Sequence, residues 1–112
     1  MTKRFSETVQ DVDVDHFTLE DVVGSGAFGV VHRARDIQNN GRKVAVKIQR
    51  CKEENESLVE GEYRVMKGFN SHPNLPVFYD VFKQSYDGKT DVWFVMEVSV
   101  RTINQYRAHS TK

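Results

Sequence analysis

The sequence predicts an α+β fold in which a five-stranded antiparallel sheet packs against one helix. Five runs rich in β-branched and aromatic residues are separated by short polar or glycine-containing turns. A single stretch between the third and fourth runs has helical periodicity instead. With 112 residues, the chain has the length of one domain with one core.

The first three strands are expected over residues 17–23, 30–35 and 43–49. The glycine-rich segment Gly24–Gly29 joins the first two, and an antiparallel hairpin is the shortest connection between them. Asn40-Gly41 is a strong turn signal before the third strand, "KVAVKIQ". Its period of two places two sets of side chains on opposite faces of the sheet: Val44, Val46 and Ile48 on one, Ala45 and Lys47 on the other.

The stretch "CKEENESLVEGEYRVMKGFNSHPN" predicts the helix. Its apolar stripe consists of Leu58, Val65, Met66 and Phe69. Ser57 and Glu60 resemble a capping box, and Pro73 lies beyond the expected end. Two glycines, Gly61 and Gly68, weaken the helix by roughly 1 kcal/mol each if both are interior. The helix should therefore depend on tertiary packing.

Glu62 falls on the same predicted stripe and should face the core. An unpaired buried carboxylate costs several kcal/mol, so it needs a partner. Lys47 is the obvious candidate, because it shares its strand face with Ala45 on the pocket side of the sheet. The alternatives are that Glu62 lies at the edge of the stripe, with Glu60 facing solvent, and that Lys47 is an exposed strand lysine.

The last two strands are expected in "NLPVFYDVFKQ" and "DVWFVMEV", joined by the turn "SYDGKT". Residues 1–15 read as a polar leader that need not be ordered. The folded unit then covers residues 16–98, and residues 99–112 form a divergent C-terminal tail. This tail is expected either to be disordered or to form a short helix through Ile103 and Tyr106.

Composition excludes several classes of protein. Sixteen Lys and Arg residues balance sixteen Asp and Glu residues, so no chain-wide field would recruit nucleic acid or an anionic membrane. Cys51 is the only cysteine, and the four histidines lack metal-ligand spacing, so no disulfide or metal site is expected. No apolar run reaches the ~18 residues of a membrane span. A cytoplasmic protein is the default expectation.

The three glycines of Gly24-x-Gly26-x-x-Gly29 are weak evidence for a phosphate site on their own, because a hairpin tip also uses glycine for positive φ. A dinucleotide-binding turn would open a helix, and a Walker loop would continue with Gly-Lys-Ser/Thr. Here Val30 and Val31 follow instead. A hairpin loop folded over phosphates remains, with Val23, Val31 and Ala45 placed to sandwich a flat base.

Four motifs in order resemble the small (N-terminal) lobe of eukaryotic protein kinases: "GSGAFGVV", "VAVK", "EYRVMKGFNSHPNL" and "VWFVMEV". The resemblance covers Phe17 to Glu97 and includes the regulatory helix. Within kinases it is greatest to the sterile-twenty-like branch, and there to the kinase heads of class III unconventional myosins. "AVKIQ", "EYRVMKGFNSHPNLPVFY" and "VWFVMEV" carry this finer likeness.

The resemblance implies a binding site for ATP, with Mg²⁺ bound only in the complete kinase. Lys47 would contact the α- and β-phosphates and pair with Glu62, and Met96 would gate the back pocket. The remaining implied residues cover the phosphates (Gly24, Gly26 and Gly29), line the adenine slot (Val23, Val31 and Ala45) and offer backbone hydrogen bonds to adenine (Glu97 and Val98). Partners would be nucleotide, protein substrates or regulators, and the actin cytoskeleton if the chain is part of a myosin, with a matching cytoskeletal location.

After Glu97 the family's pattern ends. The chain reads "VSVRTINQYRAHSTK" in place of a cysteine and a Gly-Gly-Ser stretch, and it contains no His-Arg-Asp catalytic loop. "HRARD" has its aspartate two residues too late, and Asp87-Gly88 reads as a turn. We expect this chain alone to lack kinase activity. It is either the ATP-binding fragment of a serine/threonine kinase or a non-catalytic interaction module with the same fold.

Overall fold

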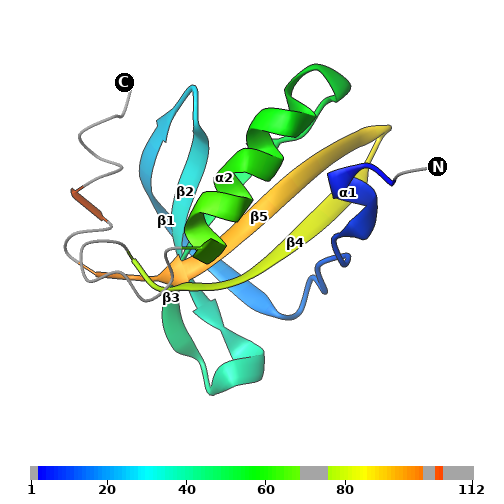
Figure 1. The fold of residues 1–112 in the computed structure, drawn as a ribbon. Helices are drawn as coiled ribbons and strands as arrows, with labels where there is room; N and C mark the ends of the chain where they lie inside the picture. The colour runs from blue at the N-terminus through cyan, green and yellow to red at the C-terminus, as the bar shows by residue number, and fades with distance from the viewer. Residues whose placement is uncertain (1–2, 69–75, 100–102, 105–112) are drawn as a thin grey trace.

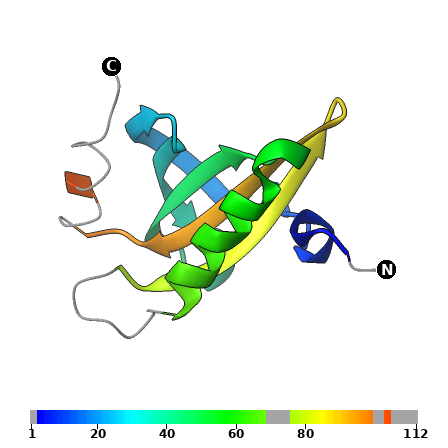
Figure 2. The same ribbon diagram turned by 45° about the horizontal axis from the view of Figure 1, so that its top comes forward.

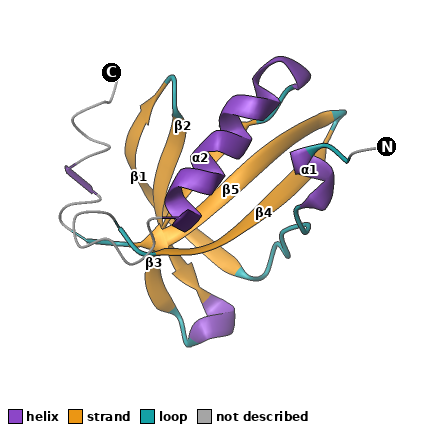
Figure 3. Ribbon diagram, in the orientation of Figure 1, coloured by secondary structure: helices purple, strands orange, loops and turns teal. Residues whose placement is uncertain are grey.

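The computed structural model describes residues 3–68, 76–99 and 103–104. It consists of a five-stranded antiparallel sheet and one main helix, which confirms the expected fold class (Figures 1 and 3). In chain order, the elements are α1 (Phe5–Thr8), β1 (Phe17–Gly26), β2 (Gly29–Asp36), a 3₁₀ turn (Ile37–Asn39), β3 (Arg42–Arg50), a second 3₁₀ turn (Glu53–Asn55), α2 (Glu56–Gly68), β4 (Phe78–Tyr86) and β5 (Lys89–Glu97).

The strand order in the sheet is β1-β2-β3-β5-β4. Every neighbouring pair is antiparallel, and α2 forms part of the connection from β3 to the edge strand β4. Strand β5 thus lies in the interior of the sheet between β3 and β4, and its residues Asp91 to Met96 are all buried. Helix α2 crosses one face of the twisted sheet (Figures 1 and 2).

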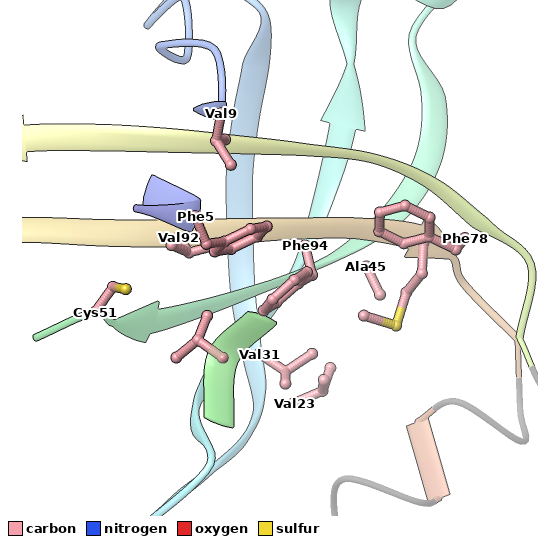
Figure 4. Packing of buried hydrophobic residues seen from close by; sticks show 11 residues of the cluster. Phe5, Val9, Val23, Val31, Ala45, Cys51, Phe78, Val92 and Phe94 are labelled. Carbon is pink, nitrogen blue, oxygen red and sulfur yellow. The ribbon is translucent and has the colours of Figure 1, made fainter. Parts of the chain in front are cut away.

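Buried side chains form one cluster on each face of the sheet. The cluster on the α2 face is shown in Figure 4 and contains Phe5, Val9, Val23, Val31, Ala45, Cys51, Val59, Phe78, Val92, Phe94 and Met96. The other contains Phe17, Ala34, Val44, Val46, Phe82, Trp93 and Val95. Strand β3 contributes Val44 and Val46 to one cluster and Ala45 to the other, as its period of two predicts.

Both predicted turns form where the sequence places them. At Asn40 the backbone is left-handed, with φ of 60°. Asp87 and Gly88 both have positive φ, 50° and 72°, between β4 and β5. Two successive residues with positive φ are what the tightest hairpin connection requires, and Asp-Gly supplies them at little steric cost.

The predicted apolar stripe of the helix needs correction. Leu58 and Val65 are 70% and 55% exposed, whereas Val59 is fully buried. Met66 packs against the core as predicted, and Tyr63, which was not predicted, does so too. The face of α2 that meets the sheet thus contains residues 59, 63 and 66. This inward face was hard to recognise in the sequence because it contains Tyr63, which is less apolar than Leu58 and Val65.

Two other helix predictions differ from the structure or lie outside it. Ser57 is the second residue of α2, so the proposed capping box is not at the helix start. Glu60 instead accepts a hydrogen bond from Arg64, 3.1 Å away between Oε2 and Nη2. Phe69 and Pro73 lie outside the described residues.

Part of the N-terminal leader packs into the core, a contact that its polar composition did not predict. Phe5 and Val9 are 7% and 8% exposed and belong to the core cluster under α2. These two side chains lie four residues apart in a stretch that is mostly polar, so average composition hid them. In the tail, the N–H of Ile103 donates to the Ser99 carbonyl, and Tyr106 lies outside the described residues.

We predict that Gly61→Ala stabilises the protein by up to about 1 kcal/mol. Gly61 is inside α2, and a Cβ built there meets no atom within 4 Å, so alanine brings its higher helix propensity without a clash. Urea unfolding followed by the fluorescence of Trp93, the chain's only tryptophan, measures the change. Gly88→Ala is the matched control and should destabilise, because its φ of 72° strains any other residue.

We also predict that Cys51 reacts slowly with Ellman's reagent in the folded protein. Burial, and secondarily the nearby Glu56 carboxylate, raises the pKa of the Cys51 thiol from 9.0 to about 11. At pH 8.5 the reactive thiolate is then about a hundredfold scarcer than in an exposed cysteine. The rate should rise more than tenfold when urea unfolds the chain, and equal rates in both states would contradict the prediction.

Candidate functional site

An ion pair between Lys47 of β3 and Glu62 of α2 lies at the centre of the candidate site. The Lys47 ammonium contacts Glu62 Oε2, and Gln49 Nε2 donates to Glu62 Oε1 at 3.2 Å. The Lys47 ammonium also lies 5.8 Å from the centroid of the Phe94 ring, within cation–π range. The site therefore holds a cation whose carboxylate partner belongs to a different element.

The two partners differ in burial, and this sets an upper limit on the free energy of folding that the pair contributes. The Lys47 side chain is only 7% exposed, whereas that of Glu62 is 36% exposed. Breaking a fully buried pair costs about 3–5 kcal/mol, but water reaches Glu62 and screens this one, so its loss should cost less. The alternation of β3 places Lys47 toward α2, and the helix periodicity places Glu62 three residues after the buried Val59.

The glycine-rich segment forms the tip of the β1–β2 hairpin. Gly26 pairs with Gly29, so the connection consists of Ala27 and Phe28 alone. Gly29 has φ of +108°, and a Cβ there would lie 2.4 Å from the Ile48 carbonyl oxygen of β3. Only glycine fits such a close approach of two backbones. Gly24 is buried and pairs with Val31.

An irregularity in β1 directs Val23 into the core. The register between β1 and β2 shifts from Val22↔His32 to Gly24↔Val31, so that one extra β1 residue lies between these pairs. Val22 is 50% exposed, whereas Val23 is 6% exposed. A bulge of this kind changes which side chain points inward.

The side chains assigned to the adenine slot lie together on the α2 face. Val23, Val31, Ala45 and Met96 belong to one buried cluster and are each at most 6% exposed. Figure 4 shows Val23, Val31 and Ala45 approaching one another from three strands. Phe28, from the hairpin tip, and Val98 are partly buried against the same cluster.

The end of β5 carries the remaining predicted residues. Met96 is opposite Ala45 on β3 and Phe78 on β4. The backbone N–H of Glu97 donates to the Val77 carbonyl at 2.8 Å, and the Val77 N–H donates to Glu97 Oε1 at 3.1 Å. The Glu97 N–H is thus already used within the sheet.

Two hollows flank the β3–α2 region. One of about 560 Å³ lies beside the ion pair and is lined by Lys47, Ser57, Leu58, Gly61, Glu62, Val65 and Met66. The other, of about 510 Å³, lies beneath the hairpin tip and is lined by Gly26, Ala27, Gly29, Gln49, Arg50, Lys52, Glu54 and Asn55. The first hollow borders the ion pair and the second borders the hairpin tip, and no residue lines both.

Sequence reasoning missed Gln49, Arg50 and Lys52. Gln49 holds Glu62, and the other two bring positive charge beneath the hairpin tip. Gln49 could have been found from the alternation of β3, because it shares a face with Ala45 and Lys47. Arg50 also contacts Asp91, with Nε 2.7 Å from Oδ1, which together with Tyr86 raises the pKa of the Arg50 guanidinium.

The described residues show no sign of a metal site or of a membrane-spanning helix. In residues 3–68, 76–99 and 103–104, no group of three or more His, Cys, Asp and Glu side chains is arranged to hold a metal ion. No helix in the part of the chain that the structure describes is long and apolar enough to span a membrane.

Comparison with known proteins identifies relatives of this chain. The chain is 42% identical over 84 residues to the neither inactivation nor afterpotential protein C of Drosophila melanogaster, an alignment that covers 74% of the chain. It is 34% identical over 83 residues to rat Misshapen-like kinase 1, covering 72%, and 31% identical over 85 residues to human myosin-IIIa, covering 75%. The chain spans only 5 or 6% of the length of these relatives.

These relatives confirm the predicted resemblance to sterile-twenty-like kinases and class III myosins. A model of the protein kinase domain also matches residues 17–111, which is most of the chain. The matched residues include the glycine-rich hairpin, the ion pair and the whole sheet. The chain belongs to the protein kinase domain family.

Proposed function

We propose that this chain is the ATP-binding small lobe of a serine/threonine protein kinase. The observation that carries the proposal is the Lys47–Glu62 ion pair between β3 and α2, next to a glycine-rich hairpin. A lysine held in this way keeps its ammonium at a fixed point of the cleft, where it can meet the α- and β-phosphates of a nucleotide. Gly24, Gly26 and Gly29 would cover those phosphates.

The buried cluster supports an apolar slot for adenine. Val23, Val31 and Ala45 come from three adjacent strands, and Met96 closes the cluster from β5. Phe28 and Val98 lie against the cluster and are only partly buried, so nucleotide entry would displace or repack them. Because the Glu97 N–H already donates to Val77, Glu97 would offer its carbonyl to adenine, and Val98 would offer its own backbone groups.

In the complete kinase, we propose that phosphoryl transfer from ATP to protein substrates depends on Mg²⁺ and a catalytic carboxylate held outside this chain. The sequence has neither a His-Arg-Asp nor an Asp-Phe-Gly motif. We further propose a cytoplasmic location, with association to the actin cytoskeleton if the chain continues into a myosin. The name of its relative myosin-IIIa supports this.

A second candidate function is a non-catalytic interaction module. Helix α2 favours it, because Leu58 and Val65 expose 70% and 55% of their surface beside the ion pair. Such a module would bind a regulator through that face and need no nucleotide. Nucleotide affinity separates the two candidates.

We predict that Lys47→Met weakens binding of a fluorescent ATP analogue by about 10- to 100-fold, because hydrogen bonds to charged groups contribute about 1.5–3 kcal/mol. Fluorescence titration of the purified chain measures this. Lys43→Met is the matched control, since Lys43 lies on the same strand but is exposed. The affinity of this variant for the ATP analogue should equal that of the unmodified chain. If the unmodified chain binds no analogue at millimolar concentration, ATP binding is refuted for this chain and the interaction module is favoured.

We predict no phosphate transfer by the 112-residue chain itself. Incubated with radiolabelled ATP, Mg²⁺ and a general protein substrate, it should label no more than a Lys47→Ala variant does. The reason is the lack of any residue in the sequence matching the catalytic carboxylate motif. Turnover well above that of the variant would overturn this part of the proposal.

A further inference from the structure

Residues 4–12, which we call the N-terminal strap, connect α2 to the edge strand β4. The strap contains α1, drawn in dark blue in Figure 1 beside β4 and near one end of α2. It precedes the first strand and contributes none of the residues assigned to nucleotide. Its contacts nevertheless reach the helix that carries Glu62.

At one end, the strap holds the first residue of α2. The N–H and the hydroxyl of Ser6 both donate to Glu56 Oε2, at 2.8 Å and 2.9 Å. Hydrogen bonds to a charged acceptor are among the stronger ones in proteins. Arg4 also lies 3.4 Å from Glu53, but both side chains are more than half exposed, so this pair should add little.

The strap makes a second contact with α2 at Tyr63, the residue that follows Glu62. The Phe5 ring is 5.3 Å from the Tyr63 ring, and Tyr63 is 5.8 Å from Phe78 of β4 in an edge-to-face arrangement. Phe5 is 7% exposed. Aromatic rings at these distances attract one another in addition to the effect of burial. Phe5 thus contacts α2 at the turn that contains Glu62.

At its other end, the strap is bonded to the sheet. The N–H of Val12 donates to the Lys83 carbonyl at 2.7 Å, and the Lys83 N–H donates to the Gln10 carbonyl at 2.9 Å. Val9 is buried in the cluster under α2. The strap is therefore anchored on β4 independently of its contacts with α2.

Helix α2 has few other anchors. Among its described residues, Val59 alone is buried, and Tyr63 and Met66 are partly so. Gly61 and Gly68 lower its helix propensity, and Leu58 and Val65 face away from the core. Its position must then depend strongly on what holds its ends.

We propose that the strap positions α2 for the Lys47–Glu62 contact, so that Phe5 and Ser6 are positioning residues for the candidate nucleotide site. Losing their contacts would let α2 move and separate the Glu62 carboxylate from Lys47. The effect on the ion pair stands on the described contacts alone. Only its consequence for nucleotide affinity rests on the proposed function.

The test observes the Lys47 side chain directly. In a chain labelled with ¹⁵N and ¹³C, an ammonium that donates to a carboxylate gives an Nζ signal protected from water exchange. The signal that disappears in Lys47→Met is that of Lys47, and Glu62→Gln then removes its carboxylate partner. We expect Phe5→Ala with Glu56→Ala to abolish the protection as Glu62→Gln does. Phe5→Tyr, which keeps the ring, should preserve it, and so should the matched control Arg4→Ala.

Trp93 emission checks that the sheet remains folded, because Trp93 lies in the cluster on the opposite face from Phe5. If the double variant unfolds, the single variants Ser6→Ala and Phe5→Leu replace it, and each should show partial loss of protection. A Lys47 signal that stays protected in folded strap variants would overturn the proposal. So would a signal that does not respond to Glu62→Gln.

The same variants separate this inference from the proposed function. If nucleotide binds, its affinity should fall in the strap variants by the same factor as in Glu62→Gln. If the unmodified chain binds no nucleotide while the strap variants lose the Lys47 signal, the proposed function fails and the positioning role of the strap stands.

Discussion

The pairing of Lys47 with Glu62 is the constraint on which the rest of the site depends. It joins the interior of the sheet to a helix that buries little of its own surface. Because only 7% of the Lys47 side chain is exposed, loss of Glu62 would remove a carboxylate partner from an almost fully buried ammonium. Gln49 donates a second hydrogen bond to the same carboxylate, and both partners of the pair line the hollow beside the helix.

The sheet and the helix differ in how firmly they are determined. Strand β5 is paired on both sides and buried from Asp91 to Met96, so no single contact decides its place. Helix α2 packs on one face only and contains two glycines. The site therefore lies where a rigid element meets an adjustable one, and small shifts of the helix change the ion pair while leaving the sheet intact.

Sequence patterns were sufficient for the sheet because each strand alternates and each turn carries its own signal, such as Asp87-Gly88. They also predicted that Lys47 and Glu62 lie on a strand and a helix that face each other. They failed where the answer depends on a long-range contact. The face that α2 turns to the sheet includes Tyr63, which packs against the core, and the packing of the strap depends on Phe5 meeting a residue far along the chain. Neither contact leaves a local pattern.

The close approach of β2 to β3 at Gly29 gives this glycine a structural role that is independent of any ligand. Its hydrogen atom faces the Ile48 carbonyl, and any larger side chain would force the two strands apart. The third glycine of this loop is thus required by the architecture, whatever the loop covers. A descendant of this lobe that had ceased to bind any ligand would still have to keep Gly29, so its retention alone would be no record of nucleotide binding.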